Sequence, residues 1–207
     1  VFKTIFRQPR PLRLGRGHAP LEWSLPVTLP HPILAVGAHL KNTIALAWKN
    51  RVVISPHIGD LSSPRSVDIF AQVIEDFQKL YAVRAEKILI DPHPQFNNTR
   101  WAKQTLLPTE PIWHHHAHAS ALAGEYPELK QWLMFTWDGV GLGEDGTMWG
   151  GETLYGEPGA WQRVGRIRPF RLLGGDKSGR ELWRSALSIC FKTQHAWQPP
   201  LELPFEF

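Results

Sequence analysis

The order of the apolar segments between residues 33 and 125 is the feature that most constrains the fold. Short apolar runs are followed by a stretch from Val67 to Tyr81 in which apolar side chains recur every three or four positions. The runs indicate β-strands, and the recurring spacing indicates an amphipathic helix. Because strands and helices then keep alternating, the sequence predicts an α/β layer. We expect strands at residues 33–38, 42–48, 51–55, 87–90 and ending near 113, and helices at 67–81, about 95–105 and 115–125.

A second series of elements opens with the apolar run WLMFTW at residues 132–137. A glycine-rich stretch follows, then two expected strands at about 147–156 and 161–168. The segment 180–192 places its apolar side chains mainly toward one side, as a helix packed on a sheet does. This order repeats the start of the first series, so we expect a duplicated architecture.

Three parts of the chain differ in composition. Residues 1–32 contain six prolines among scattered arginines, which leaves little room for a helix or a central strand, so we expect a linker there. Residues 33–127 form a complete first unit on this interpretation. Residues 128–207 form a second unit that lacks the later strands and helices of the first. The chain begins at Val1, which suggests a segment of a longer protein.

Charge, cysteine content and hydropathy limit the partners and the compartment. The chain has 23 Lys and Arg against 19 Asp and Glu, a net charge of +4. Five of the basic residues lie among the first twenty, so residues 21–207 carry 18 basic against 19 acidic groups and are nearly neutral. We therefore expect no nucleic-acid partner. A single cysteine, Cys190, calls for no oxidising compartment. No apolar run approaches the roughly 18 residues of a membrane span, and no signal peptide is evident, so we expect a cytoplasmic protein.

The strongest local motif is IWHHHAH at residues 112–118, with four imidazoles where an apolar strand meets a helix. On a helix, positions i and i+4 share a face, so His114 and His118 can offer two nitrogens to one metal ion, whereas His116 would point elsewhere. Solvated surface histidines are the alternative. No Glu lies between His114 and His118, so the motif is not that of the zinc peptidases.

A second motif, WDGVGLGEDGT at residues 137–147, ends an apolar strand with an acid and three spaced glycines. Glycines allow backbone amides to approach a ligand, as in the phosphate loops of actin-like ATPases. An ordinary hairpin is the alternative. A carboxylate is the natural third ligand of a two-histidine metal site, so Asp138 is our candidate for that role.

A third motif lies where the first expected strand turns into the second. Lys41 and Asn42 can meet an anion there, or they can cap a solvated hairpin. The segments SPHIGDL (55–61) and DPHP (91–94) also combine His and Asp at strand ends, but such pairs are more often turns than sites.

Seven motifs follow one another over nearly the whole chain: GRGHAP (15–20), ILAVGAHLKNT (33–43), SPHIGDL (55–61), DPHPQFNNTRWA (91–102), IWHHHAH (112–118), WDGVGLGEDGTMWGGE (137–152) and FRLLGGDKSGRELWR (170–184). Together they resemble the motifs of the hydrogenase maturation carbamoyltransferases, the HypF family. The chain departs from the family pattern at Ala38 and His39, which replace Gly and Glu, and at Val140, which replaces Thr.

The resemblance implies a duplicated actin-like ATPase fold of the RNase H-like type, with the first unit complete and the second truncated. It implies a divalent metal, zinc or iron, held by His114, His118 and Asp138. A further Asp ligand belongs to a C-terminal part of the family domain that lies beyond this chain. The family's acylphosphatase-like, zinc-finger and YrdC-like domains precede this region, and the linker 1–32 would follow the YrdC-like one.

The implied reaction is carbamoyl transfer from carbamoyl adenylate, made from ATP, to the C-terminal cysteine of HypE, on the route to the cyanide ligands of NiFe hydrogenase. Lys41 and Asp138 would take catalytic roles. The adenylate would meet Lys41, Asn42, Gly139, Gly141 and Gly143.

Three alternatives remain open at this point. A small-molecule O-carbamoyltransferase would share the metal site, but it would lack the GRGHAP junction. A tRNA-threonylcarbamoylation synthase would carry Glu-Gly within its His-x-x-x-His motif, where this chain has His115-His116-Ala117. The third alternative is a fragment that binds metal or a partner without turnover. Exposed core surface of an incomplete second unit would favour a homodimer.

Overall fold

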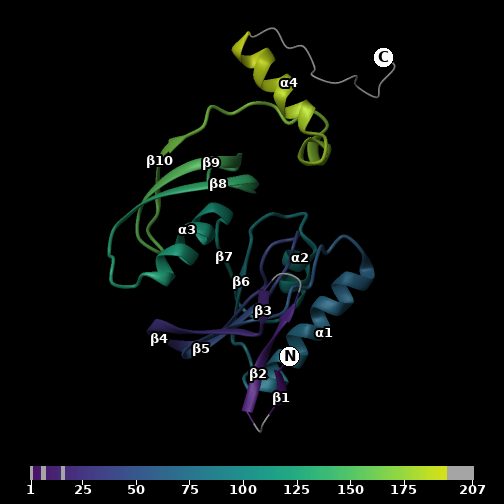
Figure 1. Cartoon of the computed structure of the whole chain (residues 1–207), viewed down its shortest axis with the longest axis vertical. Helices are drawn as coiled ribbons and strands as arrows, with labels where there is room; N and C mark the ends of the chain where they lie inside the picture. The colour runs from purple at the N-terminus through teal and green to yellow at the C-terminus, as the bar shows by residue number, and fades with distance from the viewer. Residues whose placement is uncertain (1, 6–7, 15–16, 195–207) are drawn as a thin grey trace.

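The computed structural model describes residues 2–5, 8–14 and 17–194. It is a mixed α/β protein, which confirms the predicted fold class, and its two main sheets lie in separate halves (Figure 1). The lower half in Figure 1 holds the four-stranded sheet β5-β4-β6-β7 and helices α1 and α2. The bounds of these elements are β4 Leu21–Ala35, β5 Ala45–Ile54, α1 Pro64–Tyr81, β6 Lys87–Ile90, α2 Asn97–Gln104 and β7 Thr109–Pro111.

The upper half holds the antiparallel sheet β10-β9-β8, helix α3 and helix α4 (Figure 1). A small sheet, β1-β2-β3, lies near the N-terminal end. Residues 195–207, which we assigned to the second unit, lie outside the described residues, as do residues 1, 6–7 and 15–16 of the expected linker. The bounds are β1 Phe2–Ile5, β2 Gln8–Leu14, β3 Gly17–Ala19, α3 His114–Glu125, β8 Trp132–Leu142, β9 Met148–Gly156, β10 Gln162–Arg166, the 3-10 helix η1 Gly175–Gly179 and α4 Leu182–Thr193.

Helix α1 follows directly from its sequence. Ser63 and Ser66 form a capping box at its start, and Pro64 occupies a first-turn position where no N–H is needed. Its buried side chains, Phe70, Ile74 and Phe77, have the predicted spacing and face the core of the four-stranded sheet. The amphipathic pattern at residues 67–81 is therefore confirmed.

The expected linker is wrong for residues 21–32, which belong to strand β4. This part of β4 pairs only with β5, and the parallel neighbour β6 joins at Ile33. The register shifts between Ser24 and Leu29 and again between Leu29 and Ile33. Proline can occupy a strand that is bonded on one side or bulged, because its missing N–H then costs no ladder bond. The three prolines between residues 24 and 33 all fall in these irregular stretches.

The two strands expected at residues 42–48 and 51–55 are one strand, β5. Lys49, which lies between the two expected strands, does adopt a positive φ of 51°, but it still pairs with Leu29 of β4. The register of β4 shifts on both sides of the Leu29–Lys49 pair, which accommodates the unusual backbone of Lys49, so β5 continues through this residue instead of reversing.

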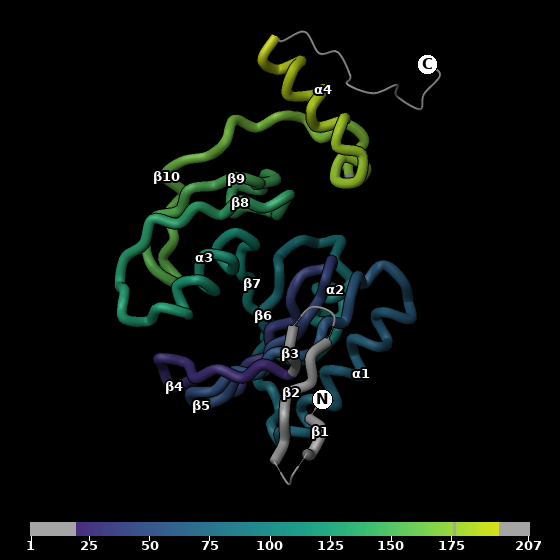
Figure 2. The backbone as a smooth tube through the Cα atoms, viewed as in Figure 1, coloured from purple at the N-terminus to yellow at the C-terminus, as the bar shows by residue number. Residues whose placement is uncertain are grey.

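Helix α3 lies beside the second sheet. Its buried Ala119 and Ala123 join Met134, Trp149 and Leu154 in a core separate from that of the first sheet. The chain runs from β7 directly into this helix, so α3 links the two halves (Figure 2). The domain division at residue 127 stays a prediction.

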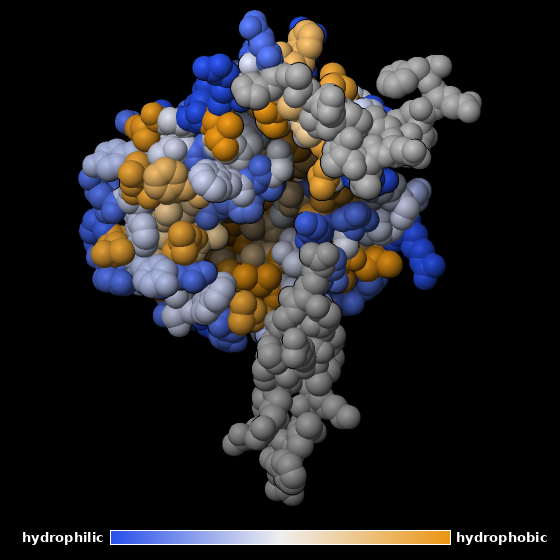
Figure 3. Space-filling model, turned by 45° about the horizontal axis from the view of Figure 1, so that its top comes forward, coloured by the Kyte–Doolittle hydropathy of each residue, from blue (hydrophilic) through white to orange (hydrophobic). Residues whose placement is uncertain are grey.

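One face of the second sheet stays exposed. Leu133, Phe135 and Trp137 alternate along β8 with buried Met134 and Thr136, and Trp137 is 76% exposed. Figure 3 shows apolar groups at several places on the face that it draws. The predicted homodimer would depend on such surface, and it stays a prediction. Among the described residues, no helix is both long enough and apolar enough to span a bilayer.

Candidate metal centre

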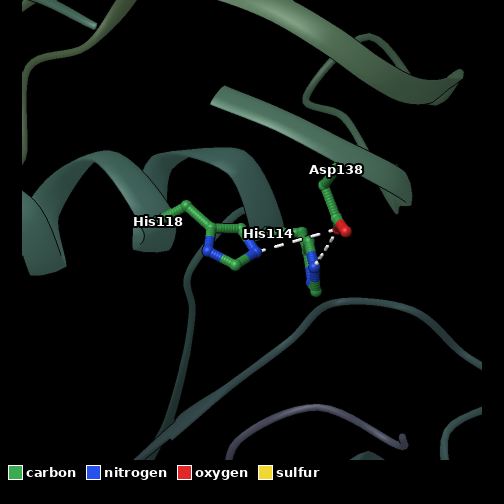
Figure 4. Close-up of side chains that lie close together, drawn as sticks. All are labelled: His114, His118 and Asp138. Atoms are coloured by element: carbon green, nitrogen blue, oxygen red, sulfur yellow. Dashed lines mark hydrogen bonds and ion pairs between the residues drawn. The ribbon is translucent and has the colours of Figure 1, made fainter. Parts of the chain in front are cut away.

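His114, His118 and Asp138 come together from two elements (Figure 4). His114 and His118 lie one turn apart on α3, and Asp138 lies on β8. The Oδ2 atom of Asp138 is 2.9 Å from Nε2 of His114 and 3.7 Å from Nε2 of His118. The three donor atoms lie within 4.8 Å of one another. The three predicted metal ligands therefore form one cluster.

A β-bulge directs Asp138 toward the helix. The β8–β9 register runs regularly to Trp137, shifts, and resumes at Gly141. Bulges often re-aim a side chain beside an active site. We expected β8 to end at residue 137 and a loop to follow, but the strand continues to Leu142 through the bulge.

Asp91, which the sequence motifs did not indicate as a site residue, contacts the second ring nitrogen of His114. Its Oδ2 atom lies 3.0 Å from Nδ1 of His114. Asp91 follows β6, and His114 follows β7, the adjacent parallel strand. The carboxyl ends of parallel strands meet at one edge of a sheet, so the strand order could have indicated this pair. The local sequence of residues 91–94 favours a turn instead.

The two carboxylates change the charge states at the centre. Hydrogen bonds to Asp138 and then to Asp91 raise the pKa of His114 from 6.5 to about 9, against the opposing effect of burial. Hydrogen bonds from His114 and then His118 hold the pKa of Asp138 well below its usual range. In the metal-free protein these contacts therefore favour the imidazolium form of His114 below about pH 9.

The other two histidines of the motif do not join the cluster. His115 is completely buried, and its Nε2 donates to the carbonyl of Gly150 at 3.2 Å. His116 packs against Trp149, so its predicted orientation away from the metal ligands is confirmed. Burial lowers the pKa of both rings. The four imidazoles thus divide into two site residues and two packing residues.

Two glycines of the second motif, Gly141 and Gly143, make room for neighbouring side chains. A Cβ atom on Gly141 would lie 2.7 Å from three atoms of His114, and one on Gly143 would lie 2.0 Å from Nε1 of Trp149. The amide of Gly139 donates to Oδ1 of Asp138, and the amide of Gly143 donates to the carbonyl of Thr147. These two amides are engaged within the hairpin, and adenylate contacts of the three glycines stay a prediction.

The hairpin between β8 and β9 is fixed by Asp145. The Thr147 hydroxyl and amide, the Trp149 indole and Arg163 all donate to its carboxylate, which holds the pKa of Asp145 well below its usual range. The Arg163 guanidinium also lies 4.3 Å over the Trp149 ring. Trp149 in turn packs on the buried His115 and the half-buried His116, so this hairpin supports α3.

Asn42 and Lys41 have separate environments. Asn42 is 1% exposed, and its Nδ2 donates to the carbonyls of Val36 and Ala38, so its amide holds the turn at residues 36–38. Lys41 has a positive φ of 51° and an exposed side chain, and its amide donates to Oδ1 of Asp60. Their predicted contacts with an adenylate, and the catalytic role of Lys41, stay predictions.

The donor set suits a transition metal. Two imidazole nitrogens and one carboxylate oxygen are ligands that zinc and iron accept, and a site with three protein ligands leaves a position for substrate or a further ligand. Donor atoms of a tetrahedral zinc site lie about 3.3 Å apart, a spacing that small side-chain movements would reach from the distances seen here. The residues present therefore fit the metal that the sequence implies.

Two family profiles, which describe parts of the same kind of domain, together match most of the chain. Residues 28–125 match a family profile described as the HypF Kae1-like domain. Residues 134–204 match one described as the second subdomain of the carbamoyltransferase Kae1-like domain.

The chain is also similar to whole proteins and solved structures. It is 36% identical over 198 residues to carbamoyltransferase HypF of Synechocystis sp., covering 93% of this chain and 25% of that protein. It is 32% identical over 186 residues to the probable carbamoyltransferase HypF of Methanocaldococcus jannaschii, covering 87% of this chain and 24% of that protein. A crystal structure of full-length HypF in a phosphate- and nucleotide-bound form aligns with a TM-score of 0.79 at 30% identity, covering 85% of this chain and 23% of that chain. The crystal structure of T. kodakarensis HypF aligns with a TM-score of 0.77 at 30% sequence identity, covering 89% of this chain and 25% of that chain. The chain spans about a quarter of the length of these relatives.

The His114 contacts predict a pH dependence of stability in metal-free protein. Its pKa is raised from 6.5 to about 9, so the stabilisation is complete below pH 6.5 and is lost as the pH rises through 9. We expect the free energy of unfolding to fall by about 1–3 kcal/mol over this interval. Urea unfolding in the presence of a chelator measures it. His114→Gln should abolish this slope and exposed His57→Gln should retain it; an unchanged slope in His114→Gln would contradict the assignment.

Two neighbouring glycines give a matched test of space at the centre. A Cβ atom on Gly141 would overlap His114, whereas one on Gly139 would meet nothing within 4 Å. We expect Gly141→Ala to lower the free energy of unfolding by about 1–3 kcal/mol and to weaken metal binding, because His114 must move. Gly139→Ala should change both little. Chemical unfolding and metal titration measure the two effects, and equal effects of the two substitutions would be the contrary result.

Proposed function

The chain belongs to the HypF family of carbamoyltransferases, and we propose that its His114, His118 and Asp138 hold the divalent metal of a carbamoyl-transfer site. The observation that carries this proposal is the convergence of the three donor atoms within 4.8 Å, from α3 and from the bulge of β8. Zinc or iron would fit this set.

The proposed substrate is carbamoyl adenylate, formed from ATP. A similar solved HypF is described as phosphate- and nucleotide-bound, which supports a ligand of this class. The proposed acceptor is the C-terminal cysteine of HypE. Since the attacking thiolate would come from that partner, the reaction needs no nucleophile from this chain.

The proposed transfer is an acyl substitution. The thiolate attacks the carbamoyl carbon, the C–S bond forms, the bond from that carbon to the phosphate oxygen breaks, and AMP leaves with the electron pair. A bound divalent metal would supply Lewis-acid polarisation of the carbamoyl or phosphate oxygens. Asp138, fixed by the bulge and by the amide of Gly139, would keep its carboxylate beside the two imidazoles. The exposed ammonium of Lys41 is our candidate to offset charge on the leaving phosphate.

The test compares three forms of the chain supplied with preformed carbamoyl adenylate and a HypE peptide that ends in cysteine. Wild type and a His31→Ala/His57→Ala control, which removes two exposed histidines, should hold about one metal ion per chain and release AMP with thiocarbamate formation. His114→Ala/His118→Ala should lose both. Elemental mass spectrometry measures the metal, and chromatography measures AMP. Equal metal content in all three forms would overturn the site, and bound metal without transfer would overturn the activity of this chain.

A further inference from the structure

The carboxylate of Asp91 is held in place by groups that are independent of His114. The residue is 8% exposed and follows the last residue of β6. Its Oδ1 atom accepts a hydrogen bond from the amide of His93 at 2.9 Å. Its backbone carbonyl accepts one from the hydroxyl of buried Thr99, on α2, at 2.7 Å. One oxygen, Oδ2, remains for His114.

The contact with His114 defines the position of a proton. An ionised carboxylate only accepts hydrogen bonds, so in the metal-free imidazolium Nε2 of His114 donates to Asp138 at 2.9 Å and Nδ1 donates to Asp91 at 3.0 Å. Loss of the Nε2 proton leaves the hydrogen on Nδ1. In the neutral ring the other nitrogen, Nε2, then has its lone pair free. Nε2 is the atom that faces Asp138 at 2.9 Å, within the cluster of donor atoms.

We propose that Asp91 is a positioning residue that fixes His114 as its Nδ1–H tautomer and so presents the Nε2 lone pair to the metal. The inference deepens the proposed function, because it rests on the metal site described there. Carboxylates that hold the second nitrogen of a metal-binding histidine fix the orientation of the ring and raise its basicity.

The position of Asp91 also explains why its contact is needed. His114 is the first residue of α3, and that helix begins without a side-chain cap. The helix packs on the second sheet, whereas Asp91 extends from β6 of the first sheet. The Asp91–His114 hydrogen bond therefore ties the start of α3 to the first sheet, as the main-chain bond from Ile112 to the carbonyl of Ile90 does just before it.

Two substitutions of Asp91 separate a tautomer effect from a packing effect. Asparagine keeps the size of the side chain but replaces one oxygen by an NH2 group. If its oxygen stays on the His93 amide, the NH2 group faces Nδ1 of His114 and draws the imidazole proton to Nε2, which then cannot bind metal. Alanine removes the contact but leaves His114 free to keep its proton on Nδ1. A tautomer role makes asparagine the more harmful change, and a packing role makes alanine the more harmful one.

Zinc titration of metal-free protein, in competition with a chromogenic chelator, measures the affinities. We expect zinc to bind about 10-fold more weakly to Asp91→Ala and about 100-fold more weakly to Asp91→Asn than to wild type. The control is Asp60→Asn, since the Asp60 carboxylate likewise accepts a backbone amide, that of Lys41, and should leave the affinity unchanged. Wild-type affinity in Asp91→Asn, or weaker binding by Asp91→Ala than by Asp91→Asn, would overturn the proposal.

A second readout does not depend on metal. In ¹⁵N-histidine-labelled, metal-free protein, the Nδ1 proton of His114 should exchange slowly with water and give an observable imidazole signal. Asp91→Ala should lose this signal, while His118→Gln should retain it. A wild type that shows the signal but takes up no zinc would overturn the metal site and leave the positioning contact in place. A signal that persists in Asp91→Ala would overturn the contact itself.

Discussion

A single imidazole, that of His114, lies between two carboxylates that come from different sheets. Asp91 extends from the end of β6 and Asp138 from the bulge of β8, at 3.0 and 2.9 Å from its two ring nitrogens. Because His114 also begins α3, this hydrogen-bonded triad fixes where the helix starts and which way its first turn faces. His118, one turn later, then lies on the same side of the helix. The proposed metal site follows from this arrangement.

The second sheet is built so that α3 can approach it closely. Ala119 and Ala123 present small side chains to the sheet, and Gly141 leaves space for the ring of His114. Trp149 packs beside the buried His115 and the half-buried His116, and its indole donates a hydrogen bond to Asp145. The glycine-rich motif thus contributes shape as well as backbone freedom. In this arrangement, a substitution that enlarges Gly141 acts through the position of His114 at the start of the helix.

Much of this could be predicted from the sequence, because periodicity and local spacing are properties of neighbouring residues. The i, i+4 histidines and the pattern of α1 are of this kind. Contacts that depend on strand order could not be predicted so directly. Asp91 was misjudged as part of a turn, since its role needs β6 and β7 to be parallel neighbours. The prolines of β4 indicate a linker, whereas a bulged strand that pairs on one side tolerates them. Asn42 bonds within its own turn, which a motif alone does not show.

The central claim is that His114, His118 and Asp138 form one metal centre. Crystals grown with stoichiometric zinc, measured on both sides of the zinc absorption edge, test it most directly. The account predicts one dominant anomalous peak, about 2.0–2.2 Å from Nε2 of His114, a nitrogen of His118 and a carboxylate oxygen of Asp138. A dominant peak at other residues, or ordered side chains at this site with no peak, would contradict it.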